Sequence, residues 1–279
     1  MKCRQDENRL SNQQGKIIHH QELSLNSKYS ERVAFHRITY LSDGLKITGF
    51  IIMPKSADDG ELFPAIIYNR GGLGPGNKID ESTLEFLAFF ADQGYIVTAT
   101  QYRGNDGSEG AEDYLGKDVN DVINIAELTQ SLSCVEPAKI FMIGFSRGGA
   151  VGYLALKNGL PVKAACIMGC AVDFVDAYEK LPHYRLLLET FFKGTPDQSL
   201  EEYTGRSPAY WPEKINVPLL IIQGTDDHHV PIEQIKRFSA TLKSLGKKTD
   251  LIIYPEGDHT LNRFQGEKEH KILEWFKQH

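Results

Sequence analysis

The chain has 279 residues, of which 41% are hydrophobic and 24% are charged, a balance typical of a globular protein and unlike that of a disordered or fibrous one. This length suits one large α/β domain with a sizeable core. The net charge of −6 provides no basic surface for a phosphate backbone, which argues against nucleic acid as a partner.

The first 32 residues are polar and show no apolar pattern, as in Gln13-Gln14-Gly15 and His19-His20. We expect a loosely attached N-terminal arm over residues 1–32, followed by one domain over residues 33–279. The start of the chain lacks the apolar run of a signal peptide, and no segment approaches the roughly 20 apolar residues that span a bilayer. The sequence therefore predicts a cytoplasmic protein without a membrane partner, and it leaves the oligomeric state open.

The cysteines are scattered along the chain and predict no disulfide framework, because a domain of this size has enough core without one. We expect reduced thiols at all positions. Cys166 and Cys170 are close in sequence, but no second Cys or His pair follows at the spacing of a zinc site, so we predict no bound metal. The cysteines are Cys3, Cys134, Cys166 and Cys170.

Strand patterns begin with two apolar runs at 33–41 and 45–53, separated by a Ser-Asp-Gly sequence typical of a hairpin turn. Strand patterns then alternate with helical patterns, which predicts parallel strands joined by helical crossovers. We expect a mostly parallel sheet of eight strands with helices on both faces. The further strands are predicted at 65–68, 95–100, 139–143, 162–168, 219–223 and 251–254, and helices near 84–90 and at 114–131, 147–157, 232–245 and 267–277.

The alternation stops at about residues 171–211, where aromatic helical fragments are interrupted by Pro182, Pro196 and Pro208. Such a segment predicts a small helical cap inserted over the functional site. One long crossover between two strands is the alternative that the pattern leaves open.

The strongest local signal is Gly144-Phe145-Ser146-Arg147-Gly148-Gly149, which follows a buried strand and opens a helix. A sharp turn of this kind holds a serine hydroxyl away from the sheet and beside a base, as a nucleophile requires. The two flanking glycines leave room at the crowded turn, and the free amides of the helix start face developing negative charge. A plain turn with a capping serine is the structural alternative. In this context we predict Ser146 as the nucleophile.

Carboxylates and a histidine follow the last two predicted strands. Asp226 and Asp227 come directly after the strand at 219–223, and either could serve as the acid by spacing. His259 follows the final strand through a short glycine-containing loop, which completes the chain order Ser, Asp, His. The three strand ends together predict a serine hydrolase with His259 as general base.

From residue 33 to its end, the chain resembles the catalytic domain of the prolyl oligopeptidase family and its esterase-like relatives, such as dienelactone hydrolases. Residues 224–231 fit the family's acid loop, Gly-x-x-Asp-x-x-Val-Pro, which implies Asp227 as the acid. Residues 102–107 are similar to the family's Arg-Gly-Ser-Gly-Gly loop. The resemblance implies an α/β-hydrolase fold and a mechanism that requires no metal or other cofactor. The catalytic triad that it implies is Ser146, Asp227 and His259.

An acyl-transfer mechanism also needs N–H donors for the charge on the tetrahedral intermediate. The first predicted donor is the backbone amide of Arg147, and the second is the amide of Arg70 or Gly71 in the loop after the third strand. Where the relatives have His or Tyr before two glycines, this chain has Arg70, so a tyrosine hydroxyl donor is absent there. A flexible turn or a phosphate-cradling loop is the alternative for these glycines, but the Lys and Ser/Thr of a P-loop are missing.

We predict Arg103 and His228 as candidate substrate-binding residues. Arg103, with Arg70 and Arg147, lies on or near the predicted catalytic face, where guanidinium groups could hold a substrate carboxylate. Ion pairs within the protein are the alternative for these arginines. His228 and His229 adjoin the acid loop and could contact substrate or metal, but an adjacent pair projects in divergent directions, which favours surface roles.

The sequence favours a small carboxylic ester as substrate. The peptidases of the family carry an additional propeller domain that filters substrates, and we expect no room and find no blade repeats for one here. A small peptide or amide is the alternative substrate. A catalytically silent binding protein on the same fold is a third hypothesis, which the intact triad argues against.

Overall fold

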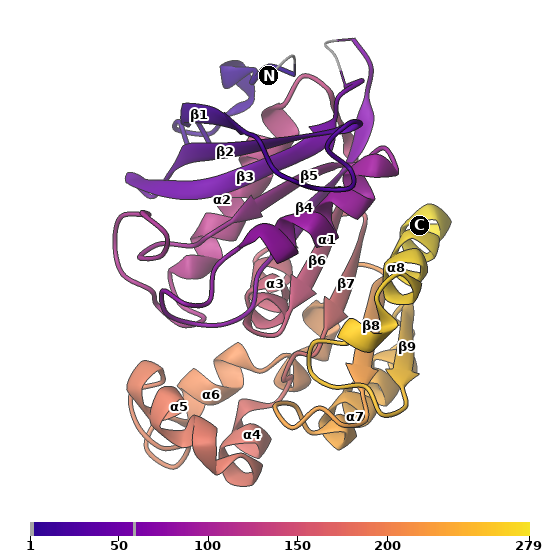
Figure 1. The fold of residues 1–279 in the computed structure, drawn as a ribbon. Helices are drawn as coiled ribbons and strands as arrows, with labels where there is room; N and C mark the ends of the chain where they lie inside the picture. The colour runs from indigo at the N-terminus through magenta and orange to yellow at the C-terminus, as the bar shows by residue number, and fades with distance from the viewer. Residues whose placement is uncertain (1–2, 58–59) are drawn as a thin grey trace.

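The computed structural model describes residues 3–57 and 60–279. In this part of the chain, one nine-stranded sheet runs in the order β1-β2-β3-β5-β4-β6-β7-β8-β9 (Figure 1). The strands from β4 to β9 are mutually parallel, and β1, β2 and β3 are each antiparallel to their neighbours. The strands are β1 (Ile17–Leu23), β2 (Val33–Ser42), β3 (Leu45–Pro54), β4 (Phe63–Asn69), β5 (Ile96–Thr100), β6 (Val135–Phe145), β7 (Ala164–Met168), β8 (Leu219–Gly224) and β9 (Thr249–Tyr254).

The mostly parallel sheet expected from the sequence is confirmed, and the eight predicted strands correspond to β2 to β9. The ninth strand, β1, lies in the segment predicted as a loosely attached arm. That prediction is wrong for the described residues 3–32, because β1 pairs with β2 and the Asp6 amide donates to Ser131 O over 2.8 Å. β1 is an edge strand without a fully buried residue, so its sequence lacks the apolar alternation that identifies a strand. Residues 1 and 2 of the predicted arm lie outside the described residues.

A disulfide joins Cys3 to Cys134, two of the cysteines expected to be reduced, so this expectation is wrong for the pair. Backbone hydrogen bonds align the two segments, with the Ser133 amide donating to Arg4 O over 2.7 Å. The partners are 131 residues apart in the sequence, and only tertiary folding brings them together. Cys166 and Cys170 are free and buried.

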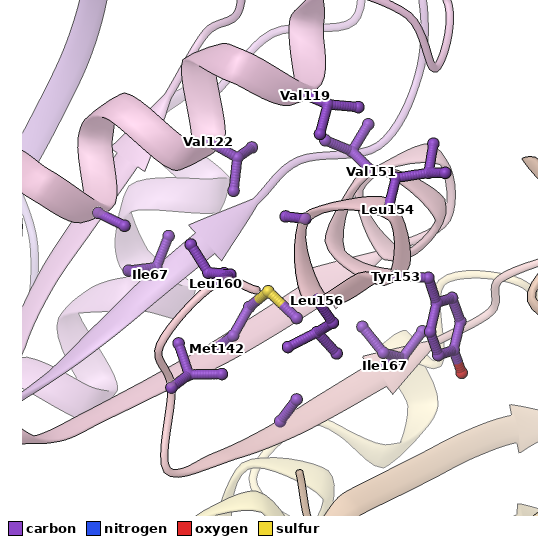
Figure 2. Close-up of a cluster of buried hydrophobic side chains, with 14 of the residues drawn as sticks. Ile67, Val119, Val122, Met142, Val151, Tyr153, Leu154, Leu156, Leu160 and Ile167 are labelled. Carbon is purple, nitrogen blue, oxygen red and sulfur yellow. The ribbon is translucent and has the colours of Figure 1, made fainter. Parts of the chain in front are cut away.

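Helices cover both faces of the sheet, with α1 and α8 on one face and α2, α3 and α7 on the other. Figure 2 shows part of the cluster on the second of these faces, where Val119 of α2 lies beside Val151 of α3. Ile67 and Met142 from strands belong to the same buried cluster. Full burial of such a side chain contributes about 1.5–3 kcal/mol. No helix within residues 3–57 and 60–279 is long and apolar enough to cross a membrane. The bounds are α1 (Glu81–Asp92), α2 (Asp118–Ser131), α3 (Arg147–Lys157), α7 (Ile232–Ser244) and α8 (Glu267–Gln278).

Short helices occupy the region between β7 and β8, where the sequence predicts an insertion. They lie together below the sheet in the view of Figure 1. Their aromatic side chains pack on one another, and the Phe192 ring meets Phe174 and Tyr203 edge-on at centroid distances of 5.5 and 4.9 Å. These helices are α4 (Phe174–Lys180), α5 (Arg185–Phe191) and α6 (Leu200–Arg206), with single 3-10 turns at Pro182–Tyr184, Pro208–Tyr210 and Pro212–Lys214. Two further 3-10 turns lie at Glu7–Arg9 and Asn262–Phe264.

Candidate active site

Ser146, Asp227 and His259 meet at the carboxyl ends of β6, β8 and β9. The carboxyl ends of parallel strands lie on one edge of a sheet, so loops that are distant in sequence are neighbours there. His259 Nε2 lies 2.9 Å from Ser146 Oγ, and His259 Nδ1 lies 2.8 Å from Asp227 Oδ2. Both separations are hydrogen-bond distances, so the three side chains form one continuous chain of hydrogen bonds.

Ser146 occupies a strained turn between β6 and α3. Its backbone angles are φ 54° and ψ −124°, a conformation that costs a non-glycine residue on the order of 1–3 kcal/mol. The Ser146 amide donates to Met168 O over 2.9 Å and holds the turn against β7. Position 148 requires glycine, because a Cβ there would lie 2.0 Å from Asn69 O. The missing side chain thus allows the start of α3 to pack directly on the end of β4.

Asp227 is a buried carboxylate with a full set of donors, and its side chain is 1% exposed. Oδ1 accepts hydrogen bonds from the backbone amides of His229 and Val230 over 2.8 and 3.1 Å. Oδ2 accepts one from the side-chain amide of Gln223 over 2.8 Å. Burial alone would raise the pKa of Asp227, but its hydrogen bonds, led by that from His259, outweigh burial and lower the pKa below its usual value. The carboxylate is therefore ionised and fixed in orientation.

Asp226 is the neighbouring carboxylate that sequence spacing left open as an alternative acid. It is exposed, and its Oδ1 accepts the hydroxyl of Thr225 over 3.0 Å. The Asp226 amide donates to Gly257 O, which turns this residue towards the outer side of the loop. Of the two carboxylates, Asp227 is the one that contacts His259.

The His259 ring is flanked by two other rings. Its centroid lies 5.1 Å from the Phe145 ring and 4.6 Å from the His229 ring. Sequence reasoning selected His228 as the candidate for substrate contact, whereas His229 is the member of the pair beside the site. His228 is exposed and borders neither cavity described below. Among the residues that the structure describes, no cluster of three or more His, Cys, Asp or Glu side chains is arranged to hold a metal.

The candidate oxyanion donors lie on either side of Ser146. Arg147 is the first residue of α3, where a helix amide has no partner within the helix. Gly71 lies against the turn, since a Cβ on it would be 3.1 Å from Ser146 Cβ. Arg70 precedes it at the end of β4, and its carbonyl accepts the Tyr102 hydroxyl over 3.1 Å. Arg147 and Gly71 therefore both lie next to Ser146.

The three arginines considered for substrate binding form ion pairs within the protein. Arg103 Nη2 lies 2.8 Å from Asp121 Oδ1, and Arg103 borders neither cavity described below. Arg70 and Arg147 share the carboxylate of Glu112, at 3.1 and 2.9 Å. The side chains of Arg70 and Arg147 are almost fully buried. The structure thus shows the ion-paired alternative for all three, and it offers no support for Arg103 as a substrate-binding residue.

Ser146 lies between two cavities of different character. A narrow pocket of about 30 Å³ extends from Ser146 towards the helices between β7 and β8, and a wide cleft of about 940 Å³ opens on its other side. Tyr184 and His229 border both cavities, and Tyr184 Oη lies 3.0 Å from His229 Nδ1. The apolar wall of the pocket includes Phe174, Ala177, Leu181, Leu188 and Val230. Polar residues of the cleft include Arg70, Asn77, Lys78, Asp80, Lys268 and Glu269.

Sequence reasoning missed Tyr184 and Glu112, and it preferred His228 to its neighbour His229. Tyr184 stands among the aromatic residues of the insertion, but its bond to His229 depends on how that insertion folds back. The ion-paired alternative for the arginines requires internal carboxylates, and Glu112 is one of them. Its position after a glycine-rich loop is a weak signal, and only the structure shows how many groups it binds.

Sequence comparison relates the chain to known proteins. Residues 82–279 match the sequence profile of the prolyl oligopeptidase family. The uncharacterized peptidase YtmA of Bacillus subtilis is 33% identical over 231 residues, which cover 82% of this chain and 88% of that protein. Acylamino-acid-releasing enzyme 1 of Oryza sativa subsp. japonica is 28% identical over 263 residues, which cover 86% of this chain and 33% of that enzyme. This chain therefore spans about a third of the length of the rice enzyme.

A solved structure also resembles the chain. The acylaminoacyl peptidase of Pyrococcus horikoshii superposes with a TM-score of 0.72 at 22% identity, over 88% of this chain and 40% of that one. At this identity the likeness concerns the fold, and it confirms the α/β-hydrolase architecture predicted from the sequence.

Proposed function

Because the chain belongs to the prolyl oligopeptidase family of serine hydrolases, we propose that it cleaves amide bonds in small peptides or acylated amino acids, with Ser146 as nucleophile. The observation that supports this most directly is the continuous chain of hydrogen bonds from Asp227 through His259 to Ser146. Family membership supports peptide cleavage over the ester preference expected from the sequence. Ester hydrolysis becomes the second candidate, because the same acyl-enzyme chemistry serves both substrates.

The proposed reaction begins with attack of Ser146 Oγ on the substrate carbonyl carbon. His259 Nε2 accepts the hydroxyl proton, and the carbonyl oxygen takes up the negative charge of a tetrahedral intermediate. The C–N bond then breaks as His259 returns the proton to the leaving nitrogen, which leaves an acyl group on Ser146. Water repeats the same steps and releases the acid. Throughout, ionised Asp227 holds the Nδ1–H of His259 and stabilises the imidazolium that forms.

We assign the oxyanion donors to the backbone amides of Arg147 and Gly71. The free amide at the start of α3 and the close approach of Gly71 to Ser146 support this assignment. Loss of one such donor typically costs about 3 kcal/mol in the activation barrier. Arg70 then contributes through its side chain, which binds the loop, in place of its amide.

The two cavities suggest how a substrate would lie. The apolar pocket would take the side chain of the residue that donates the acyl group, and its small volume suits a small apolar side chain. The wide polar cleft would take the leaving group beside His259. In this arrangement the segment at about 171–211 acts as a cap, because it supplies Phe174, Leu181 and Leu188 to the pocket.

Labelling with a fluorophosphonate probe tests the activated serine. The wild type should react, and Ser146→Ala and His259→Ala should not. Hydrolysis of alanyl and N-acetyl-alanyl p-nitroanilides, compared with short-chain p-nitrophenyl esters, then tests the substrate class. Activated esters react more readily than amides, so a higher kcat/KM on the esters does not by itself decide between the candidates. Ester hydrolysis would be favoured if the protein also failed to cleave unactivated peptide bonds. Folded wild type that is neither labelled nor active would instead indicate a silent binding protein.

The cytoplasmic location expected from the sequence is a separate proposal. The Cys3–Cys134 disulfide argues against it, because thiols in the cytosol are usually kept reduced. Thiol alkylation of the protein in its native cells tests the point: modification of both cysteines would support the cytoplasm, and protection of both would favour an oxidising compartment.

A further inference from the structure

The loop that follows β4 is held by side chains instead of by a regular element. Gly72 and Gly74 have left-handed backbone angles, with φ of 73° and 82°, and residues 70–74 form neither helix nor strand. This loop carries Gly71, whose amide we assign to the oxyanion. The position of that amide relative to Ser146 therefore depends on whatever fixes the loop.

Two guanidinium groups bind the carbonyl oxygens of the loop. Arg147 Nη1 donates to Gly72 O over 2.8 Å, and Arg70 Nη1 donates to Gly71 O over 3.0 Å. These bonds fix the carbonyls of Gly71 and Gly72. The Gly71 amide points opposite to Arg70 O in the same peptide plane, and that oxygen accepts the Tyr102 hydroxyl over 3.1 Å. The orientation of the two guanidinium groups is thus transmitted to the loop.

Glu112 is the group that the two guanidinium groups share. Its Oε1 accepts Arg147 Nη1 over 2.9 Å and Arg70 Nη2 over 3.1 Å, while its Oε2 accepts the Gly74 amide over 2.5 Å. The carboxylate therefore binds Gly74 directly, and it is linked to Gly71 and Gly72 through the two arginines. Its side chain is only 12% exposed, which strengthens these charged hydrogen bonds relative to those in water. Burial would raise the pKa of Glu112, but the bonds from Arg147 and Gly74 lower it, so the group is ionised at neutral pH.

We infer that Glu112 is a positioning residue for the reaction: its carboxylate fixes the loop at residues 70–74 so that the Gly71 amide meets the oxyanion. This inference rests on the proposed function. Glu112 does not border either cavity, so it acts through the loop and not through contact with substrate. Its loss would leave Arg70 without its carboxylate partner in a buried place and would release the Gly74 amide.

The expected kinetic effect is specific to the transition state. A displaced oxyanion donor weakens binding of the tetrahedral intermediate more than binding of the planar substrate, so kcat falls while KM changes little. We expect Glu112→Gln, which keeps the shape but not the charge, to reduce kcat by roughly 10-fold. Glu112→Ala should reduce it by roughly 100-fold, the lower end of the range for a lost oxyanion donor. Affinity for acetyl-alanyl-alaninal, whose hemiacetal with Ser146 mimics the intermediate, should fall by the same factors.

Glu109→Gln is the matched control, because Glu109 lies on the same loop as Glu112 and its exposed side chain pairs with Lys46. It should leave kcat, KM and aldehyde affinity unchanged. Melting temperatures of all variants identify any that fail to fold, and Glu112→Gln alone decides the matter if Glu112→Ala does not fold.

Two results overturn the inference in an active wild type. One is Glu112→Gln kinetics equal to those of Glu109→Gln, and the other is a fall in kcat without any loss of aldehyde affinity, which would indicate an effect outside the oxyanion site. A wild type that neither reacts with a fluorophosphonate nor turns over anilides or esters would refute the proposed function itself, before Glu112 is tested.

Discussion

Acid is expected to destabilise the fold at a histidine pair on β1 and β2, which lie at the opposite end of the sheet from β8 and β9. His36 on β2 is 3% exposed, and its Nδ1 lies 2.9 Å from Nε2 of His20 on β1. Burial, with the nearby His20 ring, lowers the pKa of His36 to about 4, although Glu22 opposes this. The facing nitrogens share one proton and cannot accommodate two, so the folded pair takes up fewer protons than the unfolded chain.

The size of the effect follows from the two pKa values. A histidine in the unfolded chain has a pKa of about 6.5, so below that pH the unfolded state binds the extra proton and stability falls. Above pH 6.5 the titration of His36 does not reduce the unfolding free energy. The reduction grows as the pH falls below 6.5 and levels off near pH 4. At pH 5 these values give a loss of about 2 kcal/mol, approaching roughly 3 kcal/mol at the acid limit.

Urea denaturation at pH 7.5 and pH 5.0 measures this loss, with His36→Gln as the comparison. The glutamine keeps an amide at the β1–β2 contact but does not titrate, and all other ionisable groups are common to both proteins. The wild type should lose about 2 kcal/mol more of its unfolding free energy than the variant does. Equal losses in the two proteins would refute the reasoning, because the pH dependence would then arise elsewhere.

Three further predictions concern the site and the disulfide. Gly148→Ala places a methyl group 2.0 Å from Asn69 O, so the turn must shift; we expect kcat/KM to fall by roughly 100-fold or more in anilide assays, and normal activity would contradict the crowding argument. Tyr184→Ala removes the ring that borders both cavities, and it should raise kcat/KM for phenylalanyl relative to alanyl anilides; an unchanged ratio would show that Tyr184 does not limit the pocket. Cys134→Ser should cost about 2–5 kcal/mol of unfolding free energy in urea, and a reductant should lower the wild type to the same value but leave the variant unaffected.

Much of the site could be predicted because its signals are local. Gly144, Ser146 and Gly148 mark a turn that only a strand followed by a helix can make, and the carboxyl ends of parallel strands then bring Asp227 and His259 to the same edge. The chain order therefore predicted Ser146 and His259 beside Asp226 or Asp227, and resemblance to the family's acid loop selected Asp227. Their catalytic roles stay a proposal that labelling and kinetics will test.

The remaining features depend on contacts between distant segments. Nothing near Cys3 indicates a partner 131 residues away, and β1 has the polar composition of an edge strand. The choice of His229 over His228 follows from loop geometry, since the His229 amide binds Asp227 Oδ1 and sets which side chain faces the site. Glu112 is informative only through its bonds to groups from two distant parts of the chain, the loop at residues 70–74 and Arg147.

The Cys3–Cys134 disulfide encloses the strands β1 to β5 in a covalent loop. The strands β8 and β9, which precede Asp227 and His259, lie outside it. A crosslink restricts the unfolded conformations of the loop that it closes and leaves the rest of the chain unaided. On heating, the C-terminal strands should therefore unfold first. The proposed activity should then be lost while the N-terminal half is still folded. On cooling, the C-terminal strands would refold against the N-terminal half that stayed folded. Unfolding by brief heating should therefore be reversible as long as the disulfide is intact.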